Sequence, residues 1–64
     1  MKLTPEQATW KRRYVNRLIA GGLSRRWAEE DFQAGYIENG KCLINLTDDP
    51  ESNASDELSY MADS

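Results

Sequence analysis

Six basic side chains lie close together near the start of the chain and could bind phosphate groups. They are Lys11, Arg12, Arg13, Arg17, Arg25 and Arg26. Such phosphate contacts give strong, salt-sensitive nucleic-acid binding. Two basic helices joined by a short turn are also typical of helix-turn-helix units. However, the second helix becomes acidic at Glu29, where such units present base-reading polar side chains. We therefore expect a surface that is neutralised by the chain's own acids or that faces a protein, with nucleic-acid binding as the weaker alternative.

Tryptophan, tyrosine and arginine, the residue types enriched in binding hot spots, are abundant in the same region. The candidate partner-binding residues are Trp10, Arg13, Tyr14, Arg17 and Trp27. Two large rings also suit a small core, so the alternative is that both tryptophans pack between the first two helices. The functional interpretation instead keeps one of them on the surface as an anchor for a partner.

Catalytic and metal-binding patterns are missing from the sequence. The chain has no histidine and one cysteine, so Ser/His and Cys/His pairs and a Cys/His zinc site cannot be assembled. Cys42 lies in an apolar run, which is typical of an inert core thiol. The acids from Asp48 onward do not have the spacing of a calcium loop. We predict a protein that is not an enzyme and that uses no metal or cofactor.

Length and composition allow one small domain. Leu, Ile, Val and Phe make up 11 of the 64 residues, which is a low number for a hydrophobic core. Charge is divided unevenly, because residues 1–26 carry a net +6 and residues 27–64 a net −9, for a total of −3. No apolar run approaches the roughly 18 residues of a membrane helix. Together with the single cysteine, this predicts a cytoplasmic protein without membrane contact.

Local signals predict two helices in the first half of the chain. Thr4, Pro5 and Gln7 form a capping pattern, and apolar residues then recur at helical spacing until Gly21 and Gly22. This predicts a helix over residues 5–20. Ser24 is the next capping residue, and it predicts a second helix over 25–34 that could run to residue 38.

The second half of the chain is more ambiguous. The Asn39–Gly40 pair is a hairpin signal, but an isolated two-stranded hairpin is marginal. We therefore favour a helix end followed by an extended apolar connector. Asp49 and Pro50 predict a weak third helix over about 50–61, docked through Leu58, Tyr60 and Met61. A disordered acidic tail over 47–64 is an equal alternative.

The predicted fold is an all-α helical hairpin, 5–20 and 25–38, completed by the connector and the third helix. We divide the chain into a helical-hairpin core, 1–46, and an acidic weak helix or flexible tail, 47–64. The expected core residues are Trp10, Tyr14, Leu18, Ile19, Leu23, Ala28, Phe32, Ile37, Leu43 and Leu46. A homodimer would add buried surface to so small a core.

Two resemblances supplement these patterns. The run from Leu18 to Ala28, with Gly21-Gly22-Leu23 and Ser24-Arg25, resembles the first half of a ubiquitin-associated (UBA-like) domain. This resemblance implies a compact three-helix shape and carries over no ubiquitin binding. The chain as a whole resembles short proteins encoded by tailed bacteriophages and prophages, with the same Thr-Pro-Glu-Gln start and an acidic ending such as Asp56 to Tyr60. That resemblance implies a small accessory protein acting in the cytoplasm of a bacterial host.

Three functional hypotheses follow. The first is a protein-interaction module that binds a host or phage protein through an aromatic and basic surface of the first helix. The second is a nucleic-acid-binding unit whose acidic tail is autoinhibitory. The third is a structural subunit of an assembly.

Overall fold

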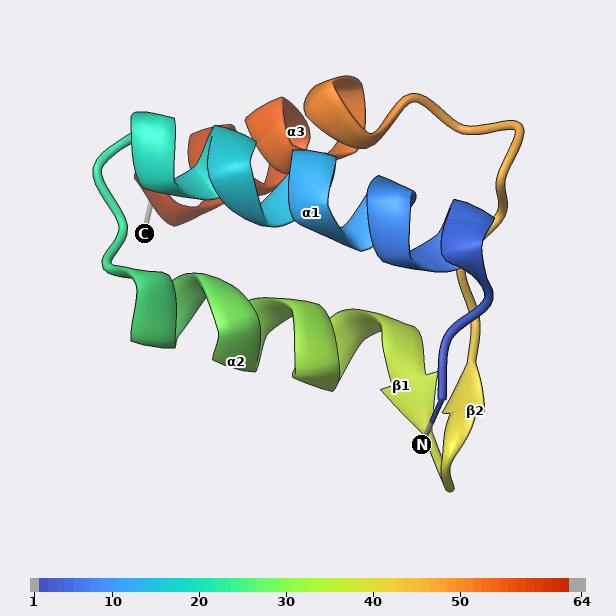
Figure 1. Cartoon of the computed structure of the whole chain (residues 1–64). Coiled ribbons are helices and arrows are strands. Elements are labelled where there is room, and N and C mark those ends of the chain that lie inside the picture. Colours follow the sequence, from blue (N-terminus) through green and yellow to red (C-terminus); the bar gives the residue numbers. More distant parts are fainter. Residues whose placement is uncertain (1, 63–64) are drawn as a thin grey trace.

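A computed structural model describes residues 2–62 as three helices and one short hairpin. The helices are α1 (Pro5–Ala20), α2 (Arg25–Tyr36) and α3 (Pro50–Ala62), and the strands are β1 (Ile37–Glu38) and β2 (Lys41–Cys42). Figure 1 shows α2 running antiparallel to α1, while α3 runs in the same direction as α1. Helix α1 packs against both other helices. The prediction of a small all-α fold is therefore confirmed.

The limits of α1 follow from local chemistry, as predicted. The Gln7 amide donates to Thr4 Oγ1 at 3.1 Å, and the Thr4 amide donates to Gln7 Oε1 at 3.0 Å, which completes the capping box. At the other end, Gly22 has a φ of +113°, a conformation that favours glycine. The chain reverses there, and Ser24 caps α2 by accepting from the Trp27 amide at 3.3 Å.

The segment after α2 differs from the favoured prediction. Helix α2 ends at Tyr36, and Asn39 and Gly40 form the tight turn of a hairpin with φ values of 52° and 77°. Two consecutive positive φ values suit a two-residue hairpin turn. Ile37 pairs with Cys42, and the Leu43 amide donates to the Tyr36 carbonyl at 2.7 Å. The hairpin persists because Ile37 packs against the core, so the preference for a simple extended connector is wrong.

Helix α3 is docked, which decides between the two alternatives for the described part of residues 47–64. Asp49 caps the helix, because its Oδ2 accepts from the Ser52 amide at 3.1 Å. Pro50 and Ala54 are buried, and Leu58 packs against the core as predicted. The predicted docking contact of Tyr60 is wrong, because its side chain is 78% exposed.

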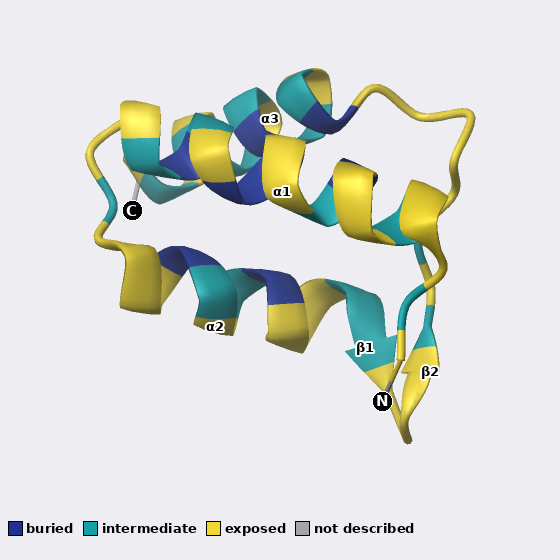
Figure 2. Ribbon diagram, in the orientation of Figure 1, coloured by how far each residue is buried: buried dark blue, intermediate teal, exposed yellow. Residues whose placement is uncertain are grey.

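The core lies along α1, where the facing sides of all three helices are buried (Figure 2). Its buried hydrophobic residues are Trp10, Tyr14, Val15, Leu18, Ala28, Phe32 and Ala54. Of the other predicted core residues, Ile19, Leu23 and Ile37 pack against this cluster while partly buried. Leu43 and Leu46, at 52% and 50% exposure, do not belong to it. Side chains alternate along an extended chain, so Ile44 faces the core in place of Leu43.

Four aromatic rings form the centre of this core. Tyr14 lies 5.5 Å from Trp10 and 5.2 Å from Tyr36 between ring centroids, and Phe32 stacks on Tyr36 at 5.4 Å. The Trp10 indole donates to the Asp48 carbonyl at 3.0 Å. The cluster therefore joins α1, α2 and the connector that leads to α3.

Candidate functional site

The two tryptophans have opposite environments. Trp10 is 4% exposed and Tyr14 is 1% exposed, whereas Trp27 is 65% exposed. The predicted partner-binding residues therefore do not form one surface. Trp10 and Tyr14 lie inside the core, and Arg13 is engaged by α3, as described below. Trp27 remains as the exposed aromatic anchor of that set.

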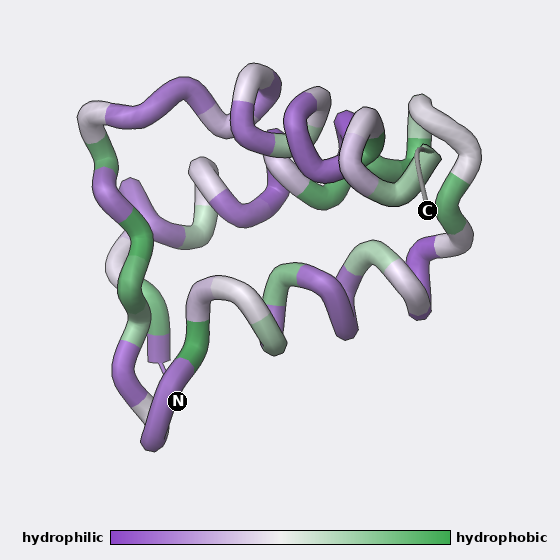
Figure 3. The backbone as a smooth tube through the Cα atoms, turned by 180° about the vertical axis from the view of Figure 1, so that it is seen from behind, coloured by the Kyte–Doolittle hydropathy of each residue, from purple (hydrophilic) through white to green (hydrophobic). Residues whose placement is uncertain are grey.

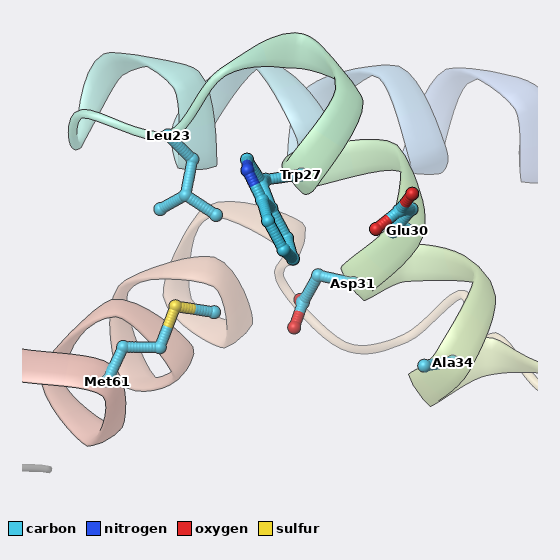
Figure 4. A pocket seen from close by; sticks show the side chains of 6 residues that line it. All are labelled: Leu23, Trp27, Glu30, Asp31, Ala34 and Met61. Carbon is cyan, nitrogen blue, oxygen red and sulfur yellow. The ribbon is translucent and has the colours of Figure 1, made fainter.

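Trp27 lies over an apolar hollow between α2 and α3. The hollow has a volume of about 570 Å³ and is lined by Leu23, Trp27, Glu30, Asp31, Ala34 and Met61. Figure 4 shows the indole ring lying between Leu23, Met61 and the Asp31 carboxylate. Hydrophobic segments also gather around the α1–α2 turn at this end of the molecule (Figure 3).

The helical repeat of α2 explains why this hollow exists. Ala28 and Phe32 point into the core, and Trp27, Asp31 and Ala34 follow a second stripe at helical spacing. This second stripe faces α3 across an open hollow, because α3 packs chiefly on α1. We call the line where α2 and α3 face each other the α2/α3 seam. It comprises the hollow, Glu57 and the Tyr36–Asn53 pair.

The seam becomes acidic at Glu30 and Asp31, which line the hollow. Asp31 Oδ2 accepts a 2.7 Å hydrogen bond from the buried Tyr14 hydroxyl. Burial, and then the Asp31 charge, raises the pKa of Glu57 on α3 above its ordinary value. Further along, the Asn53 amide donates to the Tyr36 hydroxyl at 3.4 Å, beside Asp56 and Glu57. The seam therefore has an apolar end, an acidic middle and a polar end.

Three of the six candidate phosphate-binding residues are paired with acids of the same chain. Lys11 Nζ lies 2.9 Å from Glu29, and Arg26 Nε lies 3.4 Å from Glu30. Arg13 makes a two-point contact with Glu51 of α3, its Nε lying 2.8 Å from Glu51 Oε2. Among residues 2–62, the three that form no ion pair are Arg12, Arg17 and Arg25.

Two of these unpaired arginines come together. Arg12 and Arg25 line one hollow of about 420 Å³ between α1 and α2, with Asn16 and the paired Lys11 and Glu29. Arg13 is neutralised by two acids at the start of the third helix, the capping Asp49 and Glu51 of α3. The pKa of Glu57, in contrast, is raised by burial and then by the like charge of Asp31. Of the six candidate phosphate-binding residues, only Arg13 is therefore paired with acids of this segment within residues 2–62.

Residues 2–62 were also compared with the requirements of thiol chemistry, metal binding and membrane insertion. Cys42 is half-buried at the end of β2. Within residues 2–62, no three His, Cys, Asp or Glu side chains are arranged to hold a metal ion. In the same range, no helix combines the length and hydropathy needed to span a bilayer.

Sequence reasoning selected Trp27 but missed its neighbours Leu23, Ala34 and Met61 as parts of one surface. The available signal was the second stripe of α2, with Trp27 and Ala34 seven residues apart. Met61 had no such signal, because its position depends on where α3 docks.

Comparisons with models of protein families, with curated proteins and with solved structures find no match. The residues of the surface itself are therefore the guide to function.

Proposed function

We propose that this chain is a small interaction module that binds a protein partner through the surface around Trp27. The observation that carries the proposal is a tryptophan left 65% exposed over an apolar hollow. Tryptophan is enriched in binding hot spots, and concave apolar surfaces with a few polar groups are typical of binding sites. Covering the exposed part of this ring would contribute on the order of 2 kcal/mol to binding.

This proposal moves the contact surface from α1 to α2 and α3. A surface of α1 built on Trp10 and Tyr14 would need both rings to leave the core, where they hold three elements together. The Trp27 surface needs no such change. As part of the proposal, the protein acts in the cytoplasm as an accessory factor, as expected from its resemblance to phage and prophage proteins.

The proposal can be tested by affinity purification from the source cells with three tagged forms of the chain. We expect a partner that is retained by the wild type and by Leu43→Ala but lost with Trp27→Ala. Leu43 is a matched control, because it is an apolar side chain exposed to 52% outside the seam. Circular dichroism should show that both variants remain folded. The same partners in all three samples would contradict the proposed surface.

Nucleic-acid binding is a second candidate, and it is favoured by the unpaired Arg12 and Arg25 at one hollow. In this case we expect a gel shift with the full chain at low salt that is weakened by Arg12→Gln and Arg25→Gln. Trp27→Ala should leave that shift unchanged. No shift at low salt would remove the candidate, because nonspecific phosphate contacts are strongest there.

A further inference from the structure

We infer that the α2/α3 seam takes a basic amphipathic helix, in which a bulky apolar side chain is followed one helical turn later by Lys or Arg. The inference rests on the proposed function, because it specifies the chemistry of the partner at the Trp27 surface. It is carried by the order of side chains along the seam, in which an apolar hollow is followed by carboxylates.

The first element of this recognition is the apolar hollow. Leu23, Trp27 and Met61 line it from the α1–α2 turn, from α2 and from α3. A hollow bordered by two helices accepts side chains from a third helix laid along them, and such helix-in-groove contacts are anchored at positions about one turn apart. The exposed Trp27 ring supplies the contact for a leucine-sized or phenylalanine-sized anchor.

The second element is the acidic middle of the seam. Asp31 lies four residues after Trp27, which is one helical turn or about 6 Å along α2. Asp31 lines the hollow, and Glu57 of α3 lies beside Tyr36 and Asn53 in the next part of the seam. Burial, and then the like charge of Asp31, raises the pKa of Glu57. Glu30 has a partner in Arg26, but that pair is long at 3.4 Å and the Arg26 side chain is 87% exposed. A cation beside Asp31 and Glu57 would offset the negative charge that gathers in this part of the seam.

The same charges argue against a second copy of the chain as the occupant. A symmetric dimer joined through this seam would use the same acidic surface on both copies, and would bring the carboxylates of the two seams close together. The chain also carries a net charge of −3, so two copies repel each other at long range. Charge complementarity therefore selects a basic segment of another protein.

Three synthetic peptides of about 14 residues can test this inference, a length at which isolated helices begin to form. Each carries leucines on one face, and the residue one turn after each leucine is Arg, Gln or Glu. Binding to the full-length protein is followed by nitrogen–proton correlation spectra, in which the indole signals of Trp27 and Trp10 report on the seam and on the core. We expect the Arg peptide to shift the Trp27 signal and to bind about tenfold more tightly than the Glu peptide.

Matched variants of the protein separate the two elements. Trp27→Ala should weaken the Arg peptide about tenfold or more, whereas Leu43→Ala should change its affinity by less than about twofold. Glu57→Gln should weaken the Arg peptide severalfold and leave the Gln peptide unchanged. An Arg peptide in which alanine replaces the leucines should lose binding, because charge alone does not fill the hollow.

The outcomes distinguish this inference from the proposed function. Equal binding of all three peptides at Trp27 would overturn the basic character of the partner and leave the Trp27 surface standing. If no peptide shifts the Trp27 signal, the inferred helical partner is contradicted. If the Trp27 signal shifts with protein concentration in the absence of peptide, the occupant of the seam is a second copy of the chain. Failure of the proposed function itself appears separately, as partners that do not depend on Trp27 in the purification.

Discussion

At the scale of single residues, the Tyr14–Asp31 hydrogen bond connects the core to the seam. The Tyr14 ring is buried among aromatic side chains, and its hydroxyl reaches the Asp31 carboxylate at 2.7 Å. Burial of the phenol, reinforced by that carboxylate, raises the pKa of Tyr14 well above its ordinary value. The bond therefore fixes the side chain of Asp31 while keeping its charge at the surface.

We predict that Tyr14→Phe lowers the free energy of unfolding by about 1–2 kcal/mol at neutral pH, because a hydrogen bond to a charged group is lost. The folded-state pKa is raised, so the unfolded chain releases this proton first, above about pH 10. The wild type should then lose stability as the pH rises past that value, and its advantage over Tyr14→Phe should shrink. Urea unfolding at pH 7 and pH 11 measures both effects. A constant difference would argue against this account of Tyr14.

A second residue-scale prediction compares adjacent arginines of α1. Arg13 contacts Glu51 and Asp49, while Arg12 forms no ion pair within residues 2–62. The hydrogen bond from Arg13 lowers the pKa of Glu51, so this contribution is present above about pH 4.5 and is lost as the pH falls through the folded-state value. We expect Arg13→Gln, but not Arg12→Gln, to lower the melting temperature at pH 7. In high salt, or as the pH falls below about 4.5, the difference between the melting temperatures of the two variants should shrink.

At the scale of elements, small residues let α3 lie close to the end of α1. Ala54 is fully buried, and a β-carbon on Gly21 would collide with the Leu58 side chain. Gly21 has a φ of −83°, which any residue can adopt, so packing and not backbone conformation calls for glycine there. A methyl group at residue 21 would therefore force the Leu58 side chain to move away from the end of α1.

We predict that Gly21→Ala destabilises the protein by about 1–2 kcal/mol, the usual cost of overpacking. Leu58→Ala in the same chain should offset part of this loss, giving a double variant that is more stable than the sum of the single effects. Gly35→Ala is the matched control, because a β-carbon there meets nothing within 4 Å. Inside α2 it should raise stability by about 0.5–1 kcal/mol. Chemical unfolding of the four variants tests the set, and additive effects would show that residues 21 and 58 do not interact.

At the scale of the whole molecule, local sequence signals predicted where the helices begin and end. They did not predict which side chains are buried when the helices pack together. The capping box at Thr4 and the glycines after Ala20 fixed α1, because their effects act within one helical turn. The alternation of Leu43 and Ile44 could not be oriented without knowing where the hairpin packs. Which of Trp10 and Trp27 is buried could not be predicted either, because each lies on a helix with apolar neighbours. Trp10 is covered because Tyr36 and the connector at Asp48 pack on it, and those contacts are far apart in sequence.

The docking of α3 also bears on the division into a 1–46 core and an acidic segment. Trp10 bonds to the Asp48 carbonyl, and Ala54 belongs to the same buried cluster as Leu18. Residues 1–46 alone would leave one side of α1 uncovered, in a chain whose core is already small. We therefore predict that this fragment loses cooperative thermal unfolding and the near-ultraviolet circular dichroism of its packed aromatic rings.

Adding a synthetic 47–64 peptide to the fragment should restore part of that signal, because the same apolar contacts can form between two chains. A peptide with Ala54→Asp should fail to do so, since it would bury an unpaired carboxylate against α1. Native-like cooperative unfolding of residues 1–46 alone would instead make α3 an accessory to an independent hairpin. In that case α3 could detach while α1 and α2 stay folded. Detachment of α3 would remove one side of the seam and so weaken partner binding. If α3 and the hairpin instead unfold as one unit, the docking of α3 holds Met61 opposite Trp27 and Asp31 for a partner.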